Sequence, residues 1–203
     1  MFLSRIILSD RKYKALMVQR NPNLIHGTLC SSNPGKKILW RIDHVNRARH
    51  LLLLSEEKPD LTGLVSQFGK EGAEEKTLDL SMMISRFTPG SKWIFRIKAN
   101  PVFRTLNKET GKKTYVDYKN DEARLNWLER RSSINGFSID TMNITGIETL
   151  KFKRKGADVT LASATYDGIL TVTDTILFTK TFMKGLGHGK AYGLGMLTLI
   201  PLS

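Results

Sequence analysis

Hydrophobic residues in the first half of the chain fall into short runs and alternations, separated by polar segments with helical spacing. Period-two alternation predicts strands, whereas apolar residues three or four positions apart predict helices. The cleanest alternation places Trp93, Phe95 and Ile97 on one face of a strand. We expect strands over 2–8, 38–42, 50–54, 78–84 and 92–98, and helices over 11–20, from near Asn23, and over 59–68. This order is interpreted as β-α-β-β-α-β, the ferredoxin-like pattern.

The second half has a similar but looser order of elements. Strands are expected over 136–140, 144–153, 159–165, 169–172 and 192–200, and helices over 120–131 and 174–183. Asn120 or Asp121 and Asp174 are suitable N-caps for these two helices. The predicted fold class is therefore α+β, with two tandem ferredoxin-like (RRM-like) βαββαβ domains over 1–99 and 100–203. No sequence repeat links the two halves, so the tandem prediction depends on element order alone.

Charge is the strongest global signal of the composition. The 203 residues carry a formal net charge of +13 with a pI near 9.9, while 40% are hydrophobic and 25% charged. A folded protein with this excess favours a polyanionic partner, nucleic acid before a membrane surface. No apolar run is long enough for a membrane span, and the first eight residues are too short and interrupted for a signal peptide. Cys30 is the single cysteine, which fits a reducing cytoplasm, and we expect a cytoplasmic protein.

The glycine-dense segment Gly185–Gly195 holds five of the chain's 16 glycines, together with His188 and Lys190. Such a segment can wrap a phosphate chain, because glycine permits positive φ and close backbone approach. It matches neither a P-loop nor a dinucleotide fingerprint, since Lys184 and Ala191 stand at positions that a P-loop requires to be Gly and Ser or Thr. A tight helix-to-strand connection is the alternative interpretation.

The four histidines offer little metal chemistry. None is spaced with Cys or a carboxylate as metal ligands are, so we expect neither a metal site nor a cofactor. His26 stands out because it follows a helix break and is surrounded by Gly27 and small polar residues. A histidine that titrates near neutrality suits proton transfer at a ribose hydroxyl or a leaving oxygen. From position alone, a structural or surface histidine is the favoured alternative.

A dense basic cluster occupies Lys151–Lys155, before a predicted hairpin turn at Arg154–Ala157. Such a basic hairpin can follow phosphates along a duplex groove. A solvated hairpin tip is the alternative, and the net charge of the chain favours nucleic acid.

Several motifs together resemble the CasE family, the CRISPR repeat-processing endoribonucleases of type I-E (Cascade) systems. The resemblance spans nearly the whole chain and is carried by 21–29 (NPNLIHGTL), 95–101 (FRIKANP), 127–130 (WLER), Phe137 and 185–195 (GLGHGKAYGLG). It implies two ferredoxin-like domains and metal-independent cleavage of a repeat stem-loop by the 2′-hydroxyl, leaving a 2′,3′-cyclic phosphate. His26 matches the family's catalytic histidine.

The chain departs from the family three residues before His26, where the family often has tyrosine and this sequence has Asn23. Because neither Asn23 nor Gly27 supplies a cation, transition-state charge needs another group, for which Lys36, Lys37 and Lys190 are candidates.

The resemblance also assigns the hairpin from Leu150 to Val159 to the major groove of the RNA stem. Contacts to phosphates and to the end of the stem are expected there, because the major groove of A-form RNA is deep and narrow. The expected RNA-binding residues are Lys151, Lys153, Arg154 and Lys155, with His188 and Lys190 as secondary contacts and Lys36 and Lys37 as further members of the set.

The implied partners are the CRISPR repeat RNA (crRNA) and the other subunits of the type I-E surveillance complex. Two alternatives stay open: a non-catalytic subunit that caps the crRNA hairpin, and an unrelated basic ferredoxin-like ribosomal or DNA-binding protein.

Overall fold

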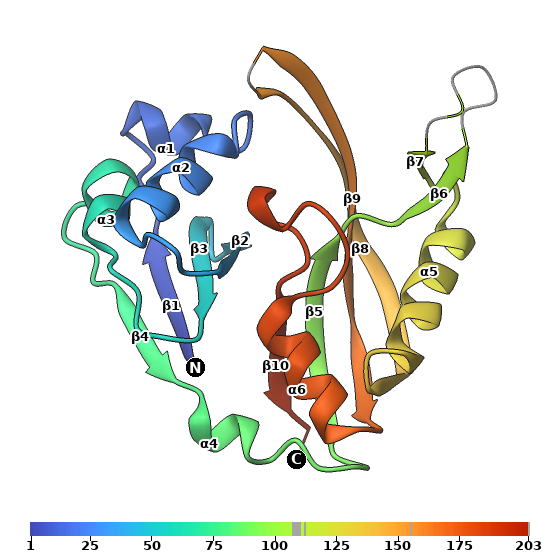
Figure 1. The fold of residues 1–203 in the computed structure, drawn as a ribbon. Helices are drawn as coiled ribbons and strands as arrows, with labels where there is room; N and C mark the ends of the chain where they lie inside the picture. Colours follow the sequence, from blue (N-terminus) through green and yellow to red (C-terminus); the bar gives the residue numbers. More distant parts are fainter. Residues whose placement is uncertain (107–110, 112, 155, 203) are drawn as a thin grey trace.

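Two four-stranded antiparallel sheets lie side by side in the computed structural model of the chain (Figure 1). The structure describes residues 1–106, 111, 113–154 and 156–202. The strand orders are β2-β3-β1-β4 and β10-β5-β9-β8. When the strands of each sheet are numbered within their own half, both orders are those of a ferredoxin-like sheet, so the predicted fold class is confirmed.

The N-terminal sheet contains β1 (Phe2–Ile7), β2 (Ile38–Val45), β3 (Ala48–Ser55) and β4 (Lys76–Asp79). Three short helices accompany it, namely α1 (Tyr13–Met17), α2 (Asn23–Ser32) and α3 (Thr62–Phe68). Their apolar faces share one core with β1 and β3, in which Ile25, Leu51, Leu64 and Phe68 are fully buried. This packing fixes α2, the helix that carries His26, against the sheet.

The C-terminal sheet contains β5 (Lys92–Ala99), β8 (Phe137–Arg154), β9 (Ala157–Val172) and β10 (Leu197–Pro201). The helices α5 (Asp121–Ser133) and α6 (Thr175–Lys184) begin at Asn120 and Asp174, whose side chains accept hydrogen bonds from Ala123 N and Leu177 N. A two-stranded ribbon of β6 (Val102–Leu106) and β7 (Lys113–Asp117) is inserted before α5. The β8–β9 hairpin extends well past its sheet (Figure 1).

The strand over 92–98 lies in a different sheet from the one we expected. β5 pairs with β9 and β10, and the short β4 completes the N-terminal sheet instead. The faces of β5 explain the difference, because Trp93, Phe95 and Ile97 are buried in the C-terminal core. Whether 1–99 and 100–203 are separate folding units stays a prediction, but the sheets themselves divide between Asp79 and Lys92.

The strand predicted over 78–84 is also partly wrong, because a short helix, α4 (Ser81–Ile84), replaces most of it. Asp79 causes this change of direction, since its carboxylate accepts hydrogen bonds from the backbone N–H and the hydroxyl of Ser81. In the second half, the four strands predicted over 136–172 merge into the long strands β8 and β9.

One buried arginine connects the two sheets. Arg41 on β2 is 1% exposed and makes a two-pronged ion pair with Asp43, with both N···O distances 2.7 Å. Its remaining N–H groups reach the C-terminal sheet, where they donate to the carbonyl oxygens of Arg96 and Met196 and to the hydroxyl of Thr198. The guanidinium therefore fixes how the two halves meet.

Over the part of the chain that the structure describes, no helix is long and apolar enough to cross a membrane.

Candidate active site and nucleic-acid interface

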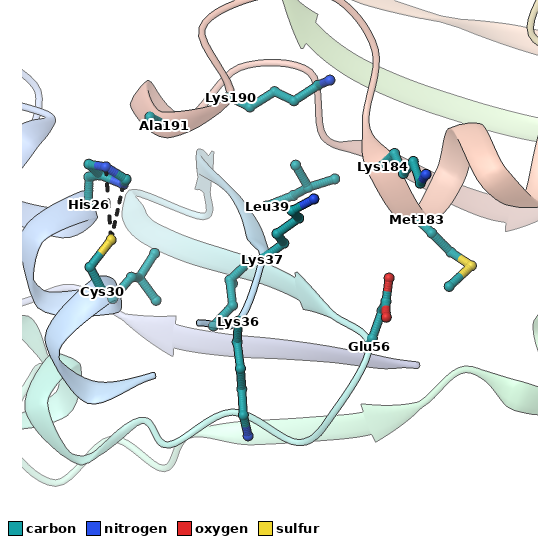
Figure 2. A pocket seen from close by; sticks show the side chains of 12 residues that line it. His26, Cys30, Lys36, Lys37, Leu39, Glu56, Met183, Lys184, Lys190 and Ala191 are labelled. Atoms are coloured by element: carbon teal, nitrogen blue, oxygen red, sulfur yellow. Dashed lines mark hydrogen bonds between the residues drawn. The ribbon is translucent and has the colours of Figure 1, made fainter. Parts of the chain in front are cut away.

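A cavity of about 480 Å³ opens where α2, β2, α6 and the segment Gly185–Gly195 (the glycine loop) approach one another (Figure 2). His26 lies at one side of it, half-buried on α2. The glycine loop ends α6 and forms a short 3-10 turn over Lys190–Tyr192 before β10, as the tight helix-to-strand connection predicts. We call this space the His26 cavity.

The imidazole of His26 has two close neighbours. The Sγ atom of Cys30, one turn later on α2, lies 3.8 Å from Nδ1 and 3.9 Å from Nε2. The ring of Tyr192, from the glycine loop, faces His26 edge-on with the ring centroids 6.4 Å apart. Tyr192 in turn packs on Phe152 of the β8–β9 hairpin at 4.6 Å, so aromatic contacts link the hairpin to the histidine.

Four lysines line the His26 cavity, and they differ in their surroundings. Lys36 forms an ion pair with Glu57 at 2.8 Å, and in the view of Figure 2 it points away from the other three. Lys37, Lys184 and Lys190 extend into the space between β2, α6 and the glycine loop (Figure 2). Burial, and secondarily the charge of Lys37, lowers the pKa of Lys190. Lys190 is therefore a cation in a partly desolvated place with the exposed Lys37 beside it, and an anion near Lys190 is stabilised more than in water.

The basic hairpin stands next to α2. Lys151, Lys153 and Arg154 are exposed on β8, while Phe152 between them is 8% exposed and faces Tyr192. The side chain of Asn23 donates a 2.9 Å hydrogen bond to the backbone carbonyl of Lys153. Lys155, the remaining predicted member of this cluster, lies outside the described residues.

His188 does not share the cavity of His26. Its ring packs against that of Tyr115 on β7 at a tilt of 55°, with the ring centroids 4.6 Å apart, and it lines a second cavity between the β6–β7 ribbon and α5. Burial, followed by the charges of Arg131 and Lys190, lowers the pKa of His188. The structure thus brings His26 together with Lys36, Lys37 and Lys190, and separates His188 from them.

Three further residues belong to this site that we did not predict from sequence. Lys184 lines the His26 cavity from the end of α6, and Tyr192 packs on the imidazole. Asn23, which replaces the family's tyrosine, connects α2 to the hairpin. The only available signal for Tyr192 was its place in the glycine-rich motif, because a contact between residues 166 positions apart leaves no periodic pattern.

Among the described residues, no three His, Cys, Asp or Glu side chains are grouped as metal ligands would be.

The chain is a tandem ferredoxin-like protein, because each half contributes one ferredoxin-like sheet. Its surface suits a polyanion, since the basic hairpin adjoins a lysine-lined cavity that contains a histidine. The family model of the CRISPR associated proteins matches residues 1–201, and the chain belongs to this family. An unrelated ribosomal or DNA-binding protein is therefore excluded.

Two curated relatives and one solved structure make the similarity specific. The CRISPR-associated endoribonuclease Cse3 of Thermus thermophilus is 25% identical over 221 residues, covering 99% of this chain and 100% of the relative. The CRISPR system Cascade subunit CasE of Escherichia coli is 21% identical over 211 residues, covering 100% of both chains. A structure of the CRISPR endoribonuclease Cse3 bound to 19 nt RNA is similar with a TM-score of 0.83 and 26% identity, covering 99% of this chain and 100% of that one.

Proposed function

We propose that this chain is a metal-independent endoribonuclease that binds and cleaves the stem-loop of CRISPR repeat RNA to release crRNA. The observation that carries the proposal is the juxtaposition of His26, the lysines of its cavity and the basic hairpin, which Asn23 ties to the helix of His26. The activity in the name of the Thermus relative and the RNA in the similar solved structure support it.

The reaction requires a proton shift and stabilisation of negative charge. The ribose 2′-oxygen forms a bond to the adjacent phosphorus as the bond from phosphorus to the 5′-oxygen of the next nucleotide breaks. A proton leaves the 2′-hydroxyl and another reaches the 5′-oxygen, giving a 2′,3′-cyclic phosphate and a 5′-hydroxyl. His26 carries one of these two transfers, because an imidazole can accept or donate a proton near neutral pH.

The lysines serve the phosphate rather than the proton. Negative charge grows on the non-bridging oxygens as phosphorus becomes five-coordinate, and cations already held in place stabilise it without reorganisation. Lys37 and Lys190 suit this role, because each lines the cavity and the ion pairs of the described residues include neither. Lys36 is the weaker candidate, since Glu57 already neutralises it.

The exposed cations of the hairpin bind the RNA duplex, and they are Lys151, Lys153 and Arg154. Phosphate contacts of this kind hold and orient a duplex, and they weaken as salt rises because counterions are released on binding. We infer that the protein acts in the cytoplasm and joins the other subunits of a type I-E surveillance complex. The Cascade membership in the name of the Escherichia coli relative supports this assignment.

The test is cleavage of the cognate repeat RNA in EDTA by the wild-type chain and by His26→Ala. One cut that leaves a 2′,3′-cyclic phosphate in the wild type, and a rate lowered by about 10²–10⁴-fold in the variant, is the expected result. His44→Ala is the matched control, because His44 lies on β2 and contacts Gln19 rather than the His26 cavity. Equal cleavage by His26→Ala, or a strict metal requirement, would refute the mechanism.

A second candidate function is a non-catalytic subunit that caps the crRNA hairpin. Two residues of α2 favour this alternative, because neither supplies a catalytic group beside His26. The side chain of Asn23 is hydrogen-bonded to the hairpin backbone, and Gly27 has no side chain. Tight binding of the repeat RNA by the wild-type chain without any cut would establish this alternative.

A further inference from the structure

The second cavity, where His188 lies, combines aromatic rings with positive charge. It encloses about 480 Å³ between the β6–β7 ribbon, α5 and the glycine loop. Its aromatic members come from β6, β7, the segment before α5, α5 and the glycine loop, and are Phe103, Tyr115, Tyr118, Trp127 and His188. No acidic side chain is among the described residues that line it. We call it the aromatic–basic cavity.

Two of these rings lie open to a ligand, because Phe103 is 40% exposed and Tyr115 is 54% exposed, and both line the same cavity. Each is supported from one side, Phe103 by Tyr118 at 5.1 Å and Tyr115 by His188 at 4.6 Å. Their free faces can therefore accept a planar group without reorganisation of the chain.

Trp127 adds a buried aromatic ring with a polar group to this cavity. It is 4% exposed and lines the aromatic–basic cavity, yet its indole N–H has no hydrogen-bond partner among the described residues. A buried donor without a partner is destabilising, and indole N–H groups usually find an acceptor.

Two of the three cations of the cavity contact these rings. Arg131 lies over Trp127, with 5.8 Å from its guanidinium carbon to the ring centroid. Arg130 donates a 3.1 Å hydrogen bond to the hydroxyl of Tyr118. Arg104 is exposed at the edge on β6. Guanidinium groups placed in this way bind phosphate oxygens, while aromatic faces stack bases of any sequence.

The glycine loop makes the two cavities neighbours. It contributes Lys190 and Ala191 to the His26 cavity and His188 to the aromatic–basic cavity. An RNA strand that leaves the duplex at the His26 cavity therefore needs only to follow this loop to reach the exposed rings.

We propose that the aromatic–basic cavity binds an unpaired nucleotide of the RNA strand that flanks the stem-loop, with the base on Tyr115 or Phe103 and its phosphate on the arginines. This assignment rests on the proposed function, because the duplex positions the strand. A nucleotide explains the observations better than a protein segment does. The described lining contains three arginines and no acidic side chain, which matches a polyanion, and only Val102 and Ile134 among these described residues are aliphatic.

The test compares the affinity of three RNAs for the full chain carrying His26→Ala, which prevents cleavage. The RNAs are the bare cognate stem-loop and the same stem-loop with a short uridine extension on its 5′ or its 3′ side. One of the extensions should tighten binding at fixed salt, and Tyr115→Ala should lower that gain roughly tenfold. Tyr115→Phe keeps the ring and should keep the gain. Tyr13→Ala, at a 74% exposed tyrosine on α1, is the matched control and should keep it too.

Photo-crosslinking locates the strand directly. A 4-thiouridine in the extension should crosslink to peptides that contain Tyr115 or His188. No gain from either extension, or a gain that survives Tyr115→Ala with crosslinks elsewhere, would overturn the proposal while stem-loop binding stands. If no stem-loop binds at all, the proposed function fails instead, and crosslinking of free oligouridine to Tyr115 then decides the cavity by itself. An unchanged RNA affinity of Tyr115→Ala, together with lost assembly with surveillance-complex subunits, would assign the cavity to a protein and overturn the proposal.

Discussion

Replacing Arg41 by methionine should destabilise the whole protein, because this one side chain satisfies partners in both sheets. All five N–H groups of its guanidinium are used: two on the carboxylate of Asp43, one on the hydroxyl of Thr198 and two on backbone carbonyls. Arg41 is 1% and Asp43 13% exposed, so solvent replaces few of these bonds. The variant would leave the mostly buried carboxylate of Asp43 and the Met196 carbonyl without their donor.

The expected loss follows from these unpaired groups. Breaking a buried ion pair from one side typically destabilises a protein by about 3–5 kcal/mol, because the remaining charge stays desolvated. For a chain of this size that corresponds to a melting temperature lower by roughly 6–20 °C. Urea unfolding and thermal melts, each followed by circular dichroism, measure the two quantities.

Arg96→Met is the matched control for this prediction. Arg96 also pairs with a carboxylate in two-pronged geometry, at 2.6 and 2.9 Å from Asp167, but its side chain is 43% exposed. An exposed pair contributes only about 0–1 kcal/mol. If Arg41→Met lost no more stability than Arg96→Met, the buried guanidinium would not be what holds the two sheets together.

Two further predictions concern the glycine loop and the response to pH. Gly193 has φ +81°, and a Cβ there would lie 2.8 Å from the Trp40 ring, so Gly193→Ala should lower the free energy of unfolding by about 1–3 kcal/mol. Gly90→Ala has a similar φ of +86° with open space around it, and an equal loss in a urea titration of both variants would refute the steric explanation. Burial first, and then the charge of Arg5, hold the pKa of His50 below 6.5 in the folded chain. Between the folded pKa and 6.5 the unfolded chain binds more protons, so the free energy of unfolding should fall as pH is lowered through this window. His50→Gln should reduce the fall without abolishing it, because the pKa of His188 is lowered too, and His44→Gln should leave it unchanged; equal pH profiles for all three proteins would contradict the argument.

Local pattern predicted the elements of this fold well and their partners less well. The alternation over 92–98 identified a strand and its buried face, but alternation is the same whichever sheet a strand joins. Asn120 and Asp174 identified two helix starts because capping is a contact within three residues. The strand predicted over 78–84 was partly wrong because the Asx turn at Asp79 outweighed the apolar run that followed.

The residues of the candidate site also differ in whether local sequence could predict them. His26 and the hairpin cations could be named because they lie within short motifs that carry the family resemblance. The grouping of Lys184 with Lys37, the contact between Tyr192 and His26, and the separation of His188 arise from tertiary packing. Glycines allow the loop from Gly185 to Gly195 to serve two cavities, and no residue count reveals which side chain enters which.

The bond between Asn23 and the hairpin has a consequence for how the site can diverge. Asn23 holds the carbonyl of Lys153, a backbone atom that every residue possesses, and leaves the ammonium group of Lys153 free of that contact. The hairpin side chains that meet a duplex can therefore change from one protein to another without altering the offset between the hairpin and His26. Under the proposed function, the hairpin side chains can therefore change to recognise a different repeat sequence. The position of the cut along the RNA stays the same, because His26 keeps its position relative to the hairpin.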